Sequence, residues 1–406
     1  MWLALWVFVS LWASAARADC PPLSPEDDTP DSCALQALLD RGGEILLKAP
    51  ATSDSPGYIL DRGLRLTVSS TRLIGPAAGN KARILAAPDI ADAMLDAHAD
   101  NFTIAYVVFD GNRENRRHKV ASCRGPRSDA YNLILRGASF VVHDLESIHT
   151  LCGSAMAVEG RDFRIYNNRI VDNGWDIFDQ ADIGYALEAW ADGMTVWRCD
   201  RGQISDNTLG DNTDIDIVVG GGDGCQVLDN RITHSRKYGF GGIHVGWFPN
   251  GDGTHTGSLF EGNRIVSEPD RLHFGIMVGL HPWVADIWLA DAGRIVNNYV
   301  EGAGINLAID GVLKAEVLSN TLGFTSSDPN LQSCPFGRGV SAPILSPPYI
   351  VHNAHAWQGD DLQPGAICMN LDEGKCEPCS AAGPDPQAPP ERIRPKVPKR
   401  GVPVGR

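Results

Sequence analysis

Two carboxyl side chains two residues apart on one predicted strand offer the clearest chemistry in this chain. Asp214 and Asp216 stand in Asn212-Thr213-Asp214-Ile215-Asp216, and alternate residues of a strand share a face at about 6.5 to 7 Å. Inverting glycosidases separate two carboxyl groups by roughly 6.5 to 9.5 Å, one as general acid and the other holding a water. The spacing therefore favours a hydrolytic carboxyl pair. The alternative is a pair of polar residues on a strand face or turn.

A histidine joins this pair when the repeats of the chain are aligned. Ile243-His244-Val245 takes the same place in its repeat as Ile215-Asp216-Ile217. Stacked strands lie about 4.8 Å apart, so the imidazole would change the proton affinity of Asp216 or transfer a proton itself. We therefore predict Asp214, Asp216 and His244 as the catalytic residues.

Further polar and aromatic residues follow the same strands and are typical of a saccharide-binding surface. Trp247 and Trp283 come just after successive strands, where an indole ring can stack on the apolar face of a sugar. The predicted substrate-binding residues are Asn306, Trp247, His281, Trp283, Asp223 and His255. For the two tryptophan segments, loop packing is the alternative. Glu188 or Asp192 could instead bind Ca²⁺ together with Asp214, because this ion prefers oxygen ligands.

Six short segments of one pattern indicate the scaffold that carries these residues. Each has an apolar residue, two further residues, Asn, any residue and an apolar residue, which predicts two short strands about a sharp bend. Asn tolerates the left-handed backbone of such a bend, and stacked Asn side chains can hydrogen-bond to one another. The shortest spacing, from Asn298 to Asn320, is about one solenoid coil, and the longer ones are a coil plus a loop. The segments end at Ile170, Leu209, Ile232, Ile265, Val300 and Leu322, and their Asn residues are 168, 207, 230, 263, 298 and 320.

This pattern predicts an all-β fold, a single-stranded parallel β-helix with an internal Asn ladder. One strand before each Asn segment, the middle residue of an apolar-x-apolar triplet should point outward. The predicted outward column is Ala157, Thr195, Asp216, His244, Met277 and Asn306. On the same face Gly242, Gly275 and Gly304 should leave room beside Asp214 for an extended ligand, so we expect a groove across the coils.

The predicted segments are a signal peptide at 1–18, an N-terminal cap at 19–44, the β-helix at 45–325, a Cys-containing extension at 326–380 and a disordered Pro-rich basic tail at 381–406. The leader has an apolar run from Trp2 to Ala13 and ends in Ala16-Arg17-Ala18, which indicates secretion or periplasmic export with removal near Ala18. No segment of the mature chain is expected to enter a membrane.

The ten cysteines all follow the predicted cleavage point, and an even number suits an oxidising compartment. Neighbours along the chain suggest the pairs Cys20 with Cys33, Cys123 with Cys152 and Cys199 with Cys225. Among Cys334, Cys368, Cys376 and Cys379, two disulfides are favoured over a zinc site. The net charge of −15 argues against a general nucleic-acid or anionic-membrane binder.

The repeat resembles the pectate lyase-like superfamily over roughly residues 45 to 325. The resemblance implies a right-handed β-helix with its substrate cleft along the strand that carries the outward column. Asn212-Thr213-Asp214-Ile215-Asp216 is similar to the Asn-Thr-Asp-x-x-Asp element of polygalacturonases with one residue missing, which implies a catalytic carboxylate at Asp214. The Gly-Asp-Asp and Gly-His-Gly elements of those enzymes have no counterpart here, since the next coils read Phe240-Gly241-Gly242-Ile243-His244 and His273-Phe274-Gly275-Ile276-Met277.

Three functions remain open from the sequence. The first is an exported enzyme that cleaves the glycosidic bonds of a polysaccharide or oligosaccharide by carboxyl acid/base chemistry, with no cofactor. The second, implied by the resemblance, is a uronate lyase or epimerase, in which Arg236, Lys237 or Arg271 would remove a proton and Ca²⁺ could take part. The third is a non-catalytic carbohydrate-binding or cell-surface solenoid.

Overall fold

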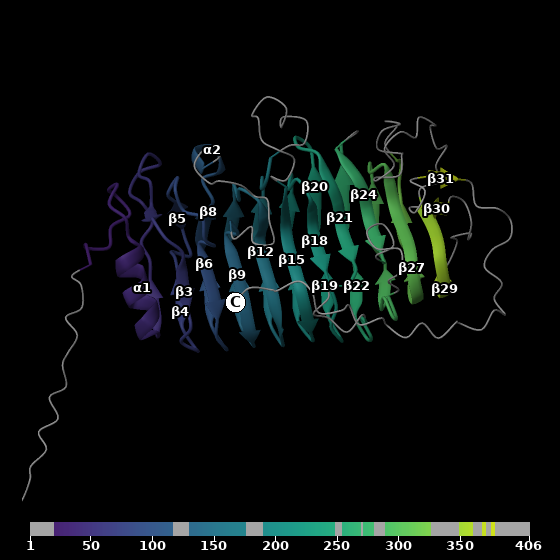
Figure 1. Ribbon diagram of the computed structural model, residues 1–406, viewed down its shortest axis with the longest axis horizontal. Coiled ribbons are helices and arrows are strands. Elements are labelled where there is room, and N and C mark those ends of the chain that lie inside the picture. Colours follow the sequence, from purple (N-terminus) through teal and green to yellow (C-terminus); the bar gives the residue numbers. More distant parts are fainter. Residues whose placement is uncertain are drawn as a thin grey trace, which may run out of the picture.

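The computed structural model describes residues 20–116, 130–175, 190–247, 254–268, 271–279, 289–325, 349–359, 368–370 and 375–377. The chain winds as a parallel β-helix, which confirms the predicted fold class (Figure 1). Each coil contributes one strand to each of three sheets, here called S1, S2 and S3, and strands in every sheet pair in parallel with the same sheet in the next coil. The predicted leader at 1–18 and the tail at 381–406 lie outside the described residues.

Sheet S1 holds the strands in which the catalytic residues were predicted. Its members are β3 (Leu64–Leu66), β6 (Leu95–His98), β9 (Leu133–Ala138), β12 (Gly153–Arg161), β15 (Ala191–Asp200), β18 (Ile215–Val219), β21 (Gly239–Val245), β24 (Leu272–Val278), β27 (Ile305–Leu318) and β29 (Tyr349–Gly359).

Sheet S2 carries the strand before each Asn corner, and S3 carries the strand after it. S2 consists of β1 (Glu44–Leu46), β4 (Arg72–Ile74), β7 (Thr103–Ala105), β10 (Val141–His143), β13 (Arg164–Tyr166), β16 (Gln203–Ser205), β19 (Gln226–Leu228), β22 (Leu259–Glu261) and β25 (Arg294–Val296), and it continues into the second half of β27. S3 consists of β2 (Tyr58–Leu60), β5 (Ala82–Ala86), β8 (Val107–Asp110), β11 (Glu146–Ile148), β14 (Arg169–Val171), β17 (Thr208–Gly210), β20 (Arg231–His234), β23 (Arg264–Ser267), β26 (Tyr299–Glu301) and β28 (Thr321–Leu322).

Side chains stacked along the helix axis form the core. In S1, one inward column runs through paired residues of successive strands, and it holds Leu64, Leu95, Leu133, Met156, Met194, Ile217, Ile243, Ile276 and Leu307. Phe140 stacks between Phe102 and Phe163 with ring centroids 4.8 and 5.0 Å apart. Burial of these columns provides the main stabilisation, since every coil removes apolar surface from water only by stacking on its neighbours.

The internal Asn ladder is present at the corner between S2 and S3. From Asn168 to Asn320, each Nδ2 donates to Oδ1 of the next ladder residue at 2.9 Å. The left-handed residue of the bend, however, is the one before the ladder Asn, as at Asn167, Asp206 and Asp229 with φ of 56°, 57° and 53°. The bend was predicted at the ladder Asn itself. The ladder Asn instead turns its side chain inward, where the stacked amides and backbone groups of neighbouring coils satisfy its hydrogen bonds.

The two ends of the solenoid differ (Figure 1). At the first end, α1 (Ser32–Arg41) buries Leu35 and Leu39 against the core, and the Gln36 side chain bonds to the backbone N–H and C=O of Arg65 in β3. This helix therefore covers the first coils. At the other end, β29 pairs in parallel with β27, so S1 continues beyond residue 325. Two short antiparallel strands, β30 (Cys368–Asn370) and β31 (Lys375–Glu377), follow.

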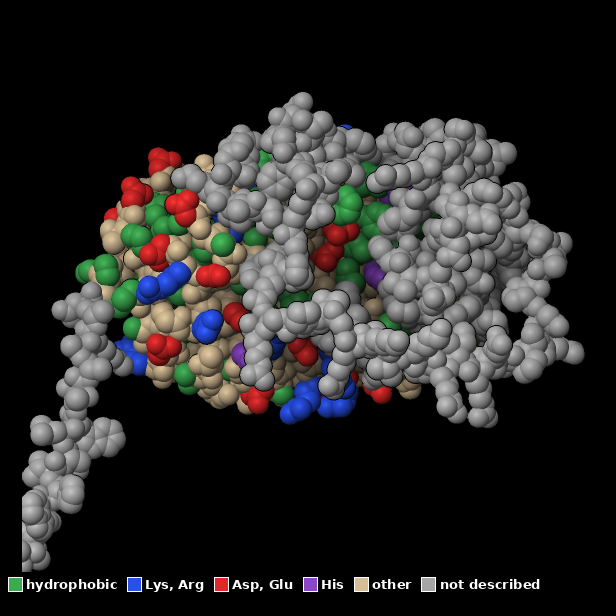
Figure 2. Space-filling view, viewed as in Figure 1, with side chains coloured by type: hydrophobic (Ala, Val, Ile, Leu, Met, Phe, Trp, Pro, Cys, Tyr) green, Lys and Arg blue, Asp and Glu red, His purple; other side chains and the backbone are tan. Residues whose placement is uncertain are grey.

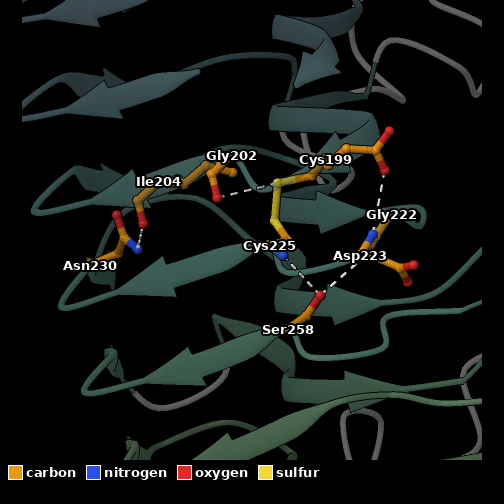
Figure 3. Close-up of a disulfide and its surroundings, with 9 residues drawn as sticks. Cys199, Gly202, Ile204, Gly222, Asp223, Cys225, Asn230 and Ser258 are labelled. Carbon is orange, nitrogen blue, oxygen red and sulfur yellow. Dashed lines mark hydrogen bonds between the residues drawn. A yellow bond between two sulfur atoms is a disulfide. The ribbon is translucent and has the colours of Figure 1, made fainter. Parts of the chain in front are cut away.

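Two of the predicted disulfides are confirmed. Cys20 bonds to Cys33, and Cys199 at the end of β15 bonds to Cys225 just before β19 (Figure 3). Ser258 in the following coil accepts a hydrogen bond from the Cys225 N–H at 3.0 Å, so the disulfide joins an inter-coil network. Cys152 is also disulfide-bonded, and its predicted partner Cys123 lies outside the described residues. Disulfides of this kind are typical of exported proteins.

A second short helix, α2 (Arg113–Arg116), follows β8. In the part of the chain that the structure describes, no helix has both the length and the apolar character needed to span a bilayer.

Candidate functional site

The outward column of S1 differs from the predicted one at two of its six positions. Strand pairing places Val218 beside Thr195 and His244, and Ala308 beside Met277. Asp216 and Asn306 lie two residues earlier and have no exposed surface. The physical reason is that these strands begin irregularly. Gly242 stands level with Asp216 in the strand pairing, and a Cβ on Gly242 would meet the interior side chain of Ile265. Two successive residues therefore face the interior, and simple alternation fails there.

Asp216 belongs to the interior of the coil. Its two carboxyl oxygens accept hydrogen bonds from Asn212 Nδ2 and His234 Nε2, both at 2.7 Å. Asn173 Nδ2 in turn donates to Asn212 Oδ1 at 2.7 Å, and Thr150 N–H donates to Asn173 Oδ1 at 2.9 Å. These contacts form a second, short ladder that sequence reasoning missed.

The signal for the second ladder was available in the sequence. Asn173 and Asn212 each follow a residue of the first ladder by five positions. The predicted outward pair of Asp214 and Asp216 is therefore not formed.

His244 is buried and lies beside Val218, not beside Asp216. Its Nε2 contacts the carbonyl oxygen of Gly279 at 2.8 Å, and burial lowers its pKa to about 4. The imidazole is therefore neutral at pH 7. The glycines predicted to clear an outer surface have another use, because a Cβ on Gly275 would meet Val300 inside the coil and one on Gly242 would meet Ile265.

The predicted substrate-binding residues are scattered. Asn306 is fully buried and donates to the carbonyl oxygens of Gly323 and Phe324, while Trp247 is partly buried against the core. His255 is fully buried and contacts the Gly246 carbonyl oxygen at 2.7 Å. Asp223 is exposed on a turn. His281 and Trp283 lie outside the described residues.

A different pair of carboxyl groups comes together on adjacent coils of S1. Asp192 is on β15 and Asp214 immediately precedes β18, and both side chains are partly exposed. The backbone N–H of Ile215 donates to Asp192 Oδ1 at 3.1 Å, and Asp214 N–H donates to the Ala191 carbonyl at 3.2 Å. Figure 2 shows acidic side chains gathered over the middle of this face, where β15 and β18 lie in Figure 1. From the sequence, Asp192 was considered only as a Ca²⁺ ligand.

The two carboxyl groups differ in their surroundings. Burial raises the pKa of Asp192 to about 6, although hydrogen bonds from Thr195 and the Ile215 N–H favour its charged form. Thr195 Oγ1 donates to Asp192 Oδ2 at 2.5 Å, and Ser154 Oγ bonds to the same hydroxyl at 2.5 Å. Burial and the nearby Asp192 charge raise the pKa of Asp214 well above its usual value. The pair thus combines a carboxyl group that accepts hydrogen bonds with one whose pKa is raised by burial and by its acidic neighbour.

Aromatic and imidazole rings occupy the next coils beside Asp214. The backbone N–H of Phe240 donates to the Asp214 carbonyl at 2.7 Å, and the Phe240 and His273 rings lie 5.8 Å apart. The Tyr238 hydroxyl is hydrogen-bonded to His273 Nδ1 at 3.0 Å. The site is therefore polar at Asp192 and aromatic on the side of β21 and β24.

Two of the three basic residues named for a lyase mechanism, Arg236 and Lys237, take part in salt bridges. Lys237 Nζ lies 2.5 Å from Asp172 Oδ1, and Arg236 Nε lies 3.0 Å from Asp211 Oδ2. Among the described residues, no group of three or more His, Cys, Asp and Glu side chains is placed to hold a metal ion. Glu188 lies outside those residues, so the Ca²⁺ site stays a prediction.

Comparison with solved structures identifies the fold. A mutant of the tailspike protein of E. coli bacteriophage HK620, in complex with a pentasaccharide, matches with a TM-score of 0.53 and 11% identity over 86% of this chain and 63% of its own. The Dettilon tailspike protein matches with a TM-score of 0.47 and 14% identity over 82% of this chain and 65% of its own. The A-module of the mannuronan C-5 epimerase AlgE6 of Azotobacter vinelandii matches with a TM-score of 0.49 and 13% identity, over 81% and 78%.

The similarity to the HK620 tailspike shows a shared right-handed parallel β-helix. The chain spans just under two thirds of the length of either tailspike. No protein-family model and no curated protein sequence matches the chain. At this level of identity the comparison concerns the fold alone.

Proposed function

We propose that this protein is an exported enzyme that hydrolyses glycosidic bonds of a polysaccharide at the Asp192–Asp214 pair. Asp214 is the general acid that protonates the leaving oxygen, and Asp192 is the carboxylate that takes a proton from the attacking water on the opposite side of the scissile bond. One observation carries the assignment: two partly exposed carboxyl groups on adjacent coils have surroundings that separate their proton affinities. Asp214 remains a member of the proposed catalytic pair, as it was in the pair predicted from the sequence, and Asp192 replaces Asp216.

Asp216, the other carboxyl group of the predicted pair, supports the site from within. Asp216 is joined to Asn212, two residues before Asp214, so the buried Asp216–His234 pair helps to hold the turn that presents Asp214. The class of substrate is inferred from the polar pair beside aromatic rings, a combination that suits sugar hydroxyls and sugar faces. The pentasaccharide bound to the HK620 tailspike is in keeping with this class.

The test is cleavage of plant, algal and bacterial polysaccharides by the wild type and by Asp192→Asn and Asp214→Asn. We expect the wild type to produce new reducing ends without an ultraviolet-absorbing double bond. The rate of cleavage should fall by about a hundredfold or more in either variant. Asp223→Asn, at an exposed carboxylate on another turn, is the matched control and should retain full activity. Cleavage that survives both site substitutions would exclude the assignment.

The same assay separates the two other functions. Products that absorb in the ultraviolet, together with activity that EDTA removes and Ca²⁺ restores, would indicate a lyase and contradict the proposal. Retention by a polysaccharide with neither cleavage nor epimerisation of its uronate residues would indicate a binding module.

A further inference from the structure

An open groove of about 490 Å³ lies at the opposite end of the S1 strands from Asp192. It crosses four successive coils at the ends of β6, β9, β12 and β15. Asp192 and Asp200 stand near the two ends of β15, so the groove is about 20 to 25 Å from the carboxyl pair. This distance makes it a site separate from the proposed catalytic one.

Strand register builds the groove from equivalent positions. Arg136 pairs with Glu159, which pairs with Arg198, and these charged side chains form its first row. Gly137 and Gly160 are paired in the next position, and a Cβ on Gly160 would meet the Gly137 carbonyl oxygen at 2.3 Å. The same Cβ would also meet the buried ring of Phe140, so glycine at this position allows the close approach of successive coils, and the backbone between the two rows of side chains forms the floor. A second row two residues further along consists of Asp100, Ala138, Arg161 and Asp200.

The charges that line the groove balance. Three arginines, Arg136, Arg161 and Arg198, face three acids, Asp100, Glu159 and Asp200. Arg198 Nε lies 2.7 Å from Asp200 Oδ2, and Arg136 lies 3.1 Å from Asp96 on the rim. Arg161 is exposed and forms no salt bridge with any residue that the structure describes. The groove thus offers closely spaced donors and acceptors with no net charge.

Two aromatic rings adjoin the groove beside Arg136. The pairing of β12 with β15 shifts after Val158, so Trp197 is an extra residue on β15 and forms a β-bulge. Its ring meets Tyr131 edge-on at 6.4 Å, and the Arg136 guanidinium lies 5.3 Å from the ring centroid. Both aromatic side chains are partly exposed. Bulges that redirect a side chain in this way are frequent beside binding sites.

We propose that this groove is a second, non-catalytic binding site for an uncharged saccharide chain that lies along the solenoid axis. Hydroxyl groups bond well to alternating guanidinium and carboxylate groups, and the partly exposed edge of the Trp197 indole, whose face Arg136 covers, would contact the chain at one end. Successive coils repeat at about 4.8 Å, close to the length of one pyranose unit, so each coil can meet one sugar. A protein partner would require an apolar centre that these residues do not provide, and a polyanion gains nothing from a lining without net charge.

The experiment is affinity electrophoresis of the full chain in gels that contain dextran, xylan, galactomannan or polygalacturonate. The Asp214→Asn background prevents cleavage, so mobility reports binding alone. We expect retardation by at least one neutral polysaccharide. Ala138→Leu, which fills the groove and removes no polar contact, and Arg161→Ala should each raise the apparent Kd by roughly tenfold or more. Trp197→Phe should bind more strongly than Trp197→Ala.

Two matched controls come from outside the groove. Arg201→Ala removes a neighbouring exposed arginine, and Tyr299→Ala removes a ring that Arg264 covers in the same manner on S3. Both should bind as the parent does. Retardation that is absent in all gels, occurs only with polygalacturonate, or is unchanged in Ala138→Leu and Arg161→Ala would overturn the proposal. Because cleavage is measured separately with Asp192→Asn and Asp214→Asn, loss of one proposal leaves the other standing.

Discussion

His234 and Asp216 form a hydrogen-bonded pair, 2.7 Å between Nε2 and Oδ2, in which neither side chain has any exposed surface. Burial opposes a charged imidazole, but the carboxylate of Asp216 raises the pKa of His234 above its usual value. The other ring nitrogen lies 3.2 Å from the carbonyl oxygen of Lys237, so both nitrogens face acceptors. The arrangement therefore favours a charged imidazole paired with the Asp216 carboxylate, beside the buried amides of Asn212 and Asn173.

We predict that Asp216→Ala destabilises the protein by about 3 to 5 kcal/mol, since it leaves His234 buried without its carboxylate. The double variant Asp216→Leu with His234→Leu should lose less, because it removes both polar groups. Urea denaturation of the two variants measures the difference. A double variant no more stable than Asp216→Ala would show that the pair is not coupled in this way.

The sequence was sufficient for the fold because its repeats carry the packing directly. Each apolar-x-x-Asn-x-apolar segment forms the S2–S3 corner, and the stacked amides follow from the spacing of Asn168 and its successors. The left-handed backbone was predicted at the ladder Asn, and it lies one residue earlier. A repeating pattern identifies the corner but does not distinguish which of two adjacent Asn, Asp or Gly residues carries the positive φ.

A second prediction concerns the ladder itself. Asn230 makes four hydrogen bonds inside the coil, with Ile204, Asn207 and Asn263, so Asn230→Ala leaves several buried groups unsatisfied. We expect the free energy of unfolding to fall by about 2 kcal/mol or more. Asn320→Ala, at the partly buried end of the ladder, is the internal control and should cost less. Equal losses from thermal or urea unfolding would contradict a cooperative ladder.

The catalytic site was less predictable because side-chain direction depends on local strand geometry. Asp214 was placed in the right region, but Asp216 faces inward where the strand begins irregularly. Asp192 was considered only as a Ca²⁺ ligand, although its spacing of 22 residues from Asp214 corresponds to about one coil. The pairing of β15 with β18 places the two residues on adjacent coils.

A third prediction follows from His149, which lies between Asp110 and Asp172 at the ends of S3 strands. Its Nδ1 is 3.0 Å from Asp110 Oδ1, and its Nε2 is 3.6 Å from Asp172 Oδ2. These carboxylates raise the pKa of His149 to about 9, against about 6.5 in an unfolded chain. The raised value means that the stabilisation is complete below about pH 6.5 and is lost as pH rises to about 9.

The measurement is the melting temperature of the wild type and His149→Gln at pH 6 and pH 9.5. The difference between them should be largest at pH 6 and shrink at pH 9.5. A difference that is constant over this range would show that His149 is not charged in the folded protein.

The last prediction tests the division of roles between Asp192 and Asp214 through the pH profile of kcat/KM. If Asp192 must be ionised, activity should rise as pH increases through about 6, the raised pKa of that carboxyl group, and fall at higher pH when Asp214 loses its proton. Thr195→Val removes a hydrogen bond that favours the charged form of Asp192, so the acidic limb should move to higher pH. Thr208→Val, at an exposed position on S3, should leave the profile unchanged. An acidic limb that stays in place in Thr195→Val would assign that limb to a group other than Asp192.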